Sequence, residues 1–154
     1  MSSAHYFETK YLIDETPATS LQNEWIKTEF FQKNCYIPDE IIYELRDNYE
    51  LDINELKKCQ IPVSYDILNQ LQIVMAQAKV VKLYQNEGNG DVLIIATALA
   101  MKNLENSKLF KDEWVIVTCD KGLSSLANNL AIRCISKEDF YRILERETGI
   151  CRKK

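Results

Sequence analysis

The sequence predicts an α/β domain of three layers, α/β/α, with helices on both sides of a mainly parallel central sheet. Short apolar runs typical of strands alternate with helical patterns along most of the chain. The run Trp114–Thr118 concentrates β-branched and aromatic residues, as a buried strand does. Residues 92–101 are apolar on nearly every side and therefore predict a helix in the centre of the domain.

The length of 154 residues is enough for one domain with a sizeable core and too short for two. We expect a single domain over residues 1–154, with its core at about 10–145 and a short basic tail at 150–154. The first residues lack the basic start and apolar stretch of a signal peptide, and the longest apolar run is too short to cross a bilayer. These features predict a cytoplasmic protein without a membrane partner.

The first strand is expected at residues 10–13, where an apolar run ends at an acid. Ser20 is placed to cap a helix whose apolar residues continue to Phe30 at helical spacing. Residues 35–37 predict a brief second strand. Residues 38–46 then predict a helix with proline in its first turn.

The middle of the chain is expected to be mostly helical. A short helix is predicted within residues 47–60, followed by an extended stretch at 61–64 that contains a proline. Ser64 can cap a long helix whose apolar positions include Ile67, Leu68, Leu71, Val74, Met75, Ala78 and Val81. Gly88-Asn-Gly90 ends that section, and Asp91 opens the buried helix, where a carboxylate can act as cap.

The last third repeats the alternation of strand and helix. After the Trp114 strand we expect an amphipathic helix at about 123–130 and a final strand at 132–135. Ser136 begins a capping sequence, and Phe140, Ile143 and Leu144 give the closing helix an apolar stripe.

Charge and cysteine content narrow the classes of function. The formal net charge of -4 provides no global attraction for nucleic acid. The chain has five cysteines, none in a C-x-x-C pair, and one histidine, so a zinc site lacks a convincing set of ligands. We expect reduced thiols, mainly in or near the core. A catalytic thiol is disfavoured because the only histidine lies in the N-terminal tail.

Four acids form a candidate site. Asp14 and Asp120 both end predicted strands, so the carboxyl edge of a parallel sheet should bring them together. Asp91 begins the buried helix, and Glu44 lies on another helix beside its apolar face. Clustered carboxylates repel one another, and Mg²⁺ or Mn²⁺ is the natural cation to join them. Each acid alone also fits a structural role, as turn residue, helix cap or solvated surface group.

The order of these acids resembles a PIN domain. The matching motifs are Tyr-Leu-Ile-Asp14-Glu-Thr16, Ile-Pro-Asp-Glu-Ile-Ile-Tyr-Glu44-Leu, Gly-Asp91-Val-Leu-Ile-Ile-Ala-Thr-Ala-Leu-Ala and Val-Thr-Cys-Asp120-Lys-Gly-Leu. Residues 131–140 also look like the last strand and helix of the family. The resemblance extends from about Lys10 to Leu144, and it rests on the order of several short motifs.

The resemblance implies a ribonuclease that hydrolyses RNA phosphodiester bonds through a metal-activated water, with one or two Mg²⁺ or Mn²⁺ ions. On it, Asp14, Asp91 and Asp120 are the main metal ligands and catalytic residues. Glu44 binds a second ion or orients water. Thr16 matches the small polar residue after the first acid, and Thr118 is expected to support the site through hydrogen bonds.

The resemblance also implies partners. Family members are often the toxin of a bacterial or archaeal toxin–antitoxin pair, which makes RNA, a small antitoxin protein and a second copy of the chain the expected partners. Candidate RNA contacts are Lys57, Lys58, Lys79, Lys82 and the Arg152 tail. The alternative is a catalytically weak PIN-fold module that binds RNA or a protein. A phosphotransfer domain with Asp14 as nucleophile fits less well, because no second aspartate follows two residues later.

Overall fold

The centre of the molecule is a five-stranded sheet in the strand order β3-β2-β1-β4-β5. The computed structural model describes residues 6–81 and 90–153. All neighbouring strands are parallel, which confirms the predicted sheet. The strands are β1 (Thr9–Ile13), β2 (Cys35–Pro38), β3 (Gln60–Ile61), β4 (Glu113–Val117) and β5 (Arg133–Ile135).

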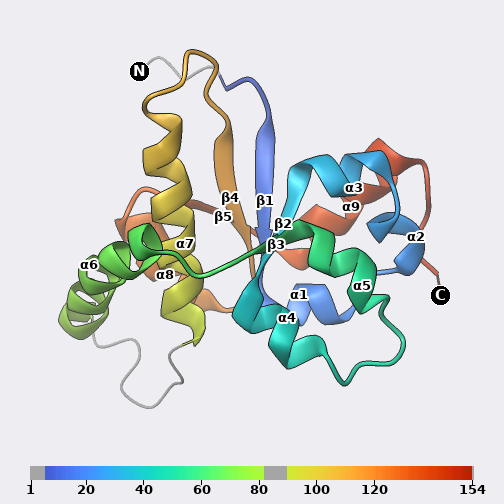
Figure 1. Cartoon of the computed structure of the whole chain (residues 1–154), viewed down its shortest axis with the longest axis horizontal. Coiled ribbons are helices and arrows are strands. Elements are labelled where there is room, and N and C mark those ends of the chain that lie inside the picture. Colours follow the sequence, from blue (N-terminus) through green and yellow to red (C-terminus); the bar gives the residue numbers. More distant parts are fainter. Residues whose placement is uncertain (1–5, 82–89, 154) are drawn as a thin grey trace.

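Helices cover both faces of this sheet, as the predicted three-layer α/β class requires (Figure 1). One layer contains α6 (Tyr65–Val81), α7 (Gly90–Glu105) and α8 (Lys121–Asn129). The other side carries α1 (Glu15–Thr19), α2 (Asn23–Ile26), α3 (Glu29–Asn34) and α9 (Lys137–Thr148). Between β2 and β3 the chain forms α4 (Asp39–Leu45), α5 (Ile53–Leu56) and the 3-10 turn η1 (Lys57–Cys59).

One part of the core lies between β1, β4 and α7, and the fully buried Trp25, Phe31 and Phe140 belong to the part on the other face of the sheet. Leu12 and Ile13 of β1 and Ile116 of β4 have no exposed surface. In α7, the residues that are at most 3% exposed include Val92, Ile94, Ile95, Ala96, Thr97, Ala98 and Ala100. The apolar segment at 92–101 is therefore the buried helix that the sequence predicts. Within the described residues, no helix combines the length and apolarity needed to cross a membrane.

The segment after β1 differs from the prediction. We expected one helix capped by Ser20, but the structure has three short helices, and Ser20 ends α1 instead of starting the next helix. Asp14 begins α1 by accepting a hydrogen bond from the Glu15 N–H at 2.8 Å. Thr28 begins α3 in the same way, accepting from the Phe31 N–H at 3.2 Å. Two local caps thus divide a segment whose apolar spacing predicted a continuous helix.

Helix α6 begins as predicted and is less buried than predicted. The Ser64 hydroxyl accepts a hydrogen bond from the Ile67 N–H at 3.2 Å, as a helix cap does. Val74 is fully buried, but Leu68 is 49% exposed. The reason is that α6 packs on α7 along one face only, at the outside of its layer (Figure 1). Of Gly88-Asn-Gly90, the first two residues lie outside the described part of the chain, and Gly90 begins α7.

The cysteines divide between core and surface. Cys35 and Cys59 are buried, Cys134 is partly buried, and Cys119 and Cys151 are exposed. Three of the five cysteines therefore lie in or near the core, as the sequence predicts, and two do not. All five are free thiols.

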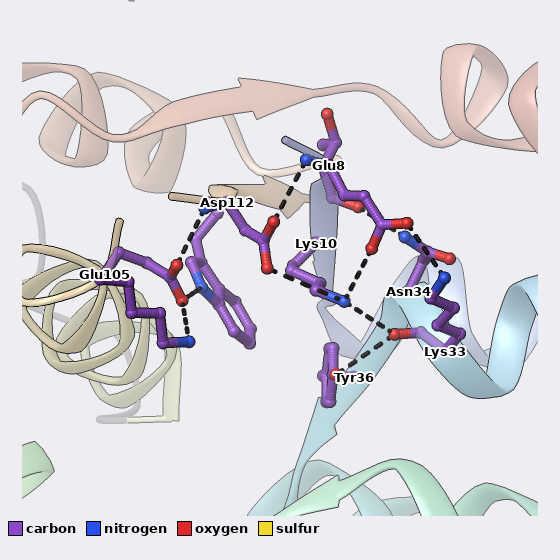
Figure 2. Close-up of polar contacts among 10 residues, drawn as sticks. Glu8, Lys10, Lys33, Asn34, Tyr36, Glu105 and Asp112 are labelled. Carbon is purple, nitrogen blue, oxygen red and sulfur yellow. Dashed lines mark hydrogen bonds and ion pairs between the residues drawn. The ribbon is translucent and has the colours of Figure 1, made fainter. Parts of the chain in front are cut away.

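A polar cluster holds the amino-terminal edge of the sheet (Figure 2). Glu105, at the end of α7, is 5% exposed. Its carboxylate accepts hydrogen bonds from the Asp112 N–H at 2.8 Å, Lys108 Nζ at 2.9 Å and Trp114 Nε1 at 3.3 Å. These bonds tie α7 to the start of β4. Burial opposes ionisation of Glu105, but the three donors outweigh it and lower the pKa of the carboxyl below its ordinary 4.5.

Replacement of Glu105 by alanine should destabilise the fold. The Asp112 N–H and the Trp114 indole would lose their acceptor, which costs about 1–3 kcal/mol of unfolding free energy. Urea denaturation at neutral pH measures this loss. Glu147→Ala is the matched control, because Glu147 is an exposed residue in a surface ion pair with Arg146.

Because the pKa of Glu105 is lowered in the folded state, the charged form stabilises the protein above pH 4.5, and that contribution is lost as pH falls through the folded pKa. The difference in unfolding free energy between wild type and Glu105→Ala should therefore become smaller at acidic pH. Equal unfolding free energies at neutral pH would contradict the role assigned to Glu105.

Candidate functional site

Asp14 and Thr118 meet at the carboxyl edge of the sheet, at the ends of the paired strands β1 and β4. The Asp14 N–H donates to the Val117 carbonyl at 3.0 Å, so the strand pairing continues one residue beyond β1. The Thr118 hydroxyl donates to Asp14 Oδ2 at 2.8 Å. Both side chains are buried, with residue exposures of 8% and 4%. The hydrogen-bonding role expected of Thr118 is present in the structure.

Asp120 is bound to the same hydroxyl. Its backbone N–H donates to Thr118 Oγ1 at 3.1 Å, and its Oδ1 accepts from the Leu123 N–H at 3.1 Å as the cap of α8. A Cβ on Gly122 would lie 3.3 Å from Asp120 Oδ1, so the glycine leaves room for this carboxylate. One threonine therefore links the two predicted acids, and helix α8 orients the second.

The charges of Asp14 and Asp120 repel each other. Burial raises the pKa of Asp14, the hydrogen bonds from Thr118 and the Glu15 N–H lower it, and the charge of Asp120 raises it again. The net shift is upward. Each oxygen of Asp14 already accepts one hydrogen bond, and each carboxylate oxygen has capacity for a second partner.

Glu40 is a site residue that the sequence reasoning missed. It lies in the first turn of α4, and both of its carboxylate oxygens are buried without a hydrogen-bond partner in the described structure. Burial raises the pKa of Glu40 to about 7. The backbone N–H of Glu40 itself opposes this rise, and Asp39 and the charge of Asp14 add to it. The signal that could have found it is its place two residues after β2, near the same sheet edge.

The structure brings only some of the predicted residues together. Glu44 lies one helical turn beyond Glu40 on α4 and is exposed. Thr16 is exposed in α1, and no hydrogen bond of its side chain is found in the described structure. Asp91 lies in the first turn of α7, but its side chain is outside the described part of the structure. The assembled group is therefore Asp14, Thr118 and Asp120, with Glu40 interacting with Asp14.

The chemistry of this group suits a hard cation, because carboxylate oxygens are the ligands that Mg²⁺ and Mn²⁺ prefer. The two unpartnered oxygens of Glu40 are the observation that fits such an ion. Within residues 6–81 and 90–153, no three histidine, cysteine, aspartate or glutamate side chains are gathered closely enough to form a metal centre.

Two clefts adjoin the acids. The first, of about 560 Å³, has Thr118, Asp120 and Lys121 in its lining, at the start of α8. The second, of about 420 Å³, has Glu40 in its lining, together with Tyr43 and Arg46 of α4 and Lys57 of η1. The acids therefore have a cleft on the β4–β5 side of the sheet and another on the β2–β3 side.

No protein-family model matches the chain, and a search of curated proteins found no significant match. The functional argument therefore rests on the geometry of the site and on the short sequence motifs.

Thr118→Val should destabilise the protein. The change keeps the side-chain shape and removes the hydroxyl that serves both Asp14 and the Asp120 N–H, so the expected loss is about 1–3 kcal/mol of unfolding free energy. Chemical denaturation with and without the substitution measures it. Thr97→Val is the matched control, because the buried Thr97 hydroxyl donates only to the Leu93 carbonyl of its own helix. A larger loss at Thr97 than at Thr118 would contradict the linking role.

Proposed function

We propose that the protein is a metal-dependent ribonuclease whose centre contains Asp14, Glu40 and Asp120. The observation that carries this proposal is the pair of buried, unpartnered oxygens of Glu40 beside the charge of Asp14. A buried carboxylate without a donor is unfavourable, and so is a second carboxylate near it. A divalent cation would relieve both. The parallel sheet supports the proposal, since ligands of open α/β sheets bind at the carboxyl ends of the strands.

In this proposal Asp14, Glu40 and Asp120 would hold Mg²⁺ or Mn²⁺ after moving closer together, because no three such side chains are gathered closely enough for a metal centre in the described structure. Asp91 stays a prediction of the family resemblance, as do the antitoxin and the homodimer. Glu44, which the resemblance makes a metal ligand, is exposed and is not part of the proposed centre. The bound ion supplies an activated water and neutralises charge on the phosphodiester. Thr118 is a positioning residue, because its hydroxyl fixes one oxygen of Asp14. The cap of α8 holds Asp120 Oδ1 toward Leu123 and leaves Oδ2 for another partner.

Conservative substitution of the acids tests the activity. Cleavage of single-stranded RNA in Mn²⁺ should stop in chelator and in Asp14→Asn, Asp120→Asn and Glu40→Gln. The cleavage activity of Thr118→Val should be roughly 10- to 100-fold lower than that of wild type, which is the usual effect of removing a hydrogen-bond partner from a metal ligand. The three acid variants should lose more activity than this.

Glu44→Gln is the matched control on the same helix, since Glu44 is exposed. We expect it to keep most of the activity. Cleavage that persists in chelator, or in Asp120→Asn, would reject the metal-dependent mechanism. Binding of RNA without any cleavage would favour the alternative, a catalytically weak module.

The pH dependence of stability tests the site without an activity assay. The pKa of Glu40 is raised to about 7 in the folded protein, from an ordinary 4.5. Its contribution to stability is therefore complete below pH 4.5 and is lost as pH rises through about 7. In chelator, wild type should lose on the order of 1–2 kcal/mol across this window, a figure reduced for the partial exposure of Glu40.

Glu40→Gln should flatten that profile, because glutamine does not titrate. Added Mn²⁺ should stabilise wild type above pH 7 by binding the folded state, and it should stabilise Glu40→Gln less. Thermal or urea unfolding with and without Mn²⁺ measures both effects. Parallel pH profiles for the two proteins would refute the assignment of Glu40.

A further inference from the structure

The cleft beside Glu40 combines an aromatic ring with two cations. Tyr43 of α4 is 62% exposed, and the Arg46 guanidinium carbon lies 3.6 Å from the centre of its ring. Arg46 Nη1 also donates to the Tyr43 backbone carbonyl at 2.7 Å. The contact with the ring and the hydrogen bond to the carbonyl together hold the Arg46 guanidinium over the Tyr43 ring. Lys57 of η1 is an exposed residue in the lining of the same cleft.

These two cations differ from most other basic residues whose side chains the structure describes, because most of those are ion-paired. Within the described structure, no carboxylate lies within ion-pair distance of Arg46 or Lys57. By contrast, Lys58 pairs with Glu55 at 3.1 Å, and Arg152 of the tail pairs with Glu145 at 3.3 Å. Of the candidate RNA contacts whose side chains the structure describes, Lys58 and Arg152 are ion-paired and Lys57 is not. The side chains of Lys79 and Lys82 lie outside the described part of the structure.

We propose that the Tyr43–Arg46–Lys57 cleft is a subsite that binds an unpaired nucleotide next to the scissile phosphate. Bases stack on aromatic rings and on arginine planes, and such stacking requires a base that is not paired in a duplex. Lys57 and the free N–H groups of Arg46 contact the phosphate backbone. Glu40 lines the same cleft, which puts this nucleotide beside the catalytic acids. This inference rests on the proposed function.

The test is the binding of a short fluorescent single-stranded RNA, measured by anisotropy in chelator, where metal-dependent cleavage does not interfere. We expect Tyr43→Leu and Arg46→Gln each to weaken binding about tenfold. Lys57→Gln should lower the slope of log affinity against log salt by about 1. The same RNA annealed to its complement should bind more weakly than the single strand.

The controls are Tyr49→Leu and Lys58→Gln. Tyr49 is a 95% exposed tyrosine outside this cleft, and Lys58 is the ion-paired neighbour of Lys57. Both variants should bind RNA like wild type. Circular dichroism melts of all variants, which alter exposed residues, verify that they are folded. Equal effects of Tyr43→Leu and Tyr49→Leu, or equal affinity for duplex and single strand, would overturn the proposal.

The binding test and the cleavage test fail separately. If the cleft variants weaken single-strand binding but wild type cleaves nothing in Mn²⁺, the subsite stands and the nuclease proposal falls. If wild type cleaves RNA while the cleft variants bind and cleave as wild type does, the nuclease proposal stands and the subsite falls. An absence of measurable RNA binding by wild type also rejects the subsite.

Discussion

The hydrogen bond from the Thr118 hydroxyl to Asp14 Oδ2 is the contact on which the candidate site depends. It joins the residues that follow β1, the central strand of the sheet, and β4, its neighbour. The Thr118 N–H donates to the Ile135 carbonyl at 3.1 Å, which adds the end of β5 to the same unit. Because these groups are largely buried, removing the hydrogen-bond partner of any one of them would lower the stability of the folded protein. The carboxyl edge is therefore fixed by the pairing of the strands before any ligand arrives.

Within this edge the acids differ in how their charge is supported. Asp14 receives two hydrogen bonds, and Asp120 receives one from the first turn of α8. The oxygens of Glu40 receive none in the described structure, and burial raises the pKa of Glu40 to about 7. The least favourable environment for a charged carboxylate in this site is therefore that of Glu40. A proton at Glu40 removes its charge, and in the proposed metal centre a cation would balance that charge, so pH and metal concentration would act on the same group.

Much of the fold could be predicted because it depends on local patterns. The buried strands, the apolar helix α7 and the caps at Ser64 and Ser136 are each visible within a few residues. The prediction of a single helix after Ser20 was wrong. The side chains of Asp14 and Thr28 each cap a separate short helix, and these local hydrogen bonds are not visible in the spacing of apolar residues.

The choice between Glu40 and Glu44 could not be made from the sequence. The two residues lie one turn apart on α4, whose buried face consists of Ile41, Ile42 and Leu45. Which glutamate interacts with Asp14 depends on how α4 is placed against the end of β1, a tertiary property. Asp14 and Asp120 were accessible to prediction because the parallel sheet brings the ends of strands together whatever their separation in the chain.

The surface ion pairs reduce the non-specific attraction between this protein and long nucleic acids. Lys33 pairs with Glu8, Lys27 with Asp52 and Lys153 with Glu24, so much of the positive charge is already neutralised within the fold. Together with the net charge of -4, this gives the molecule little non-specific retention on long nucleic acids. If the proposed nucleotide subsite binds RNA, the time that the protein stays on a strand would therefore depend mainly on the contacts within that cleft.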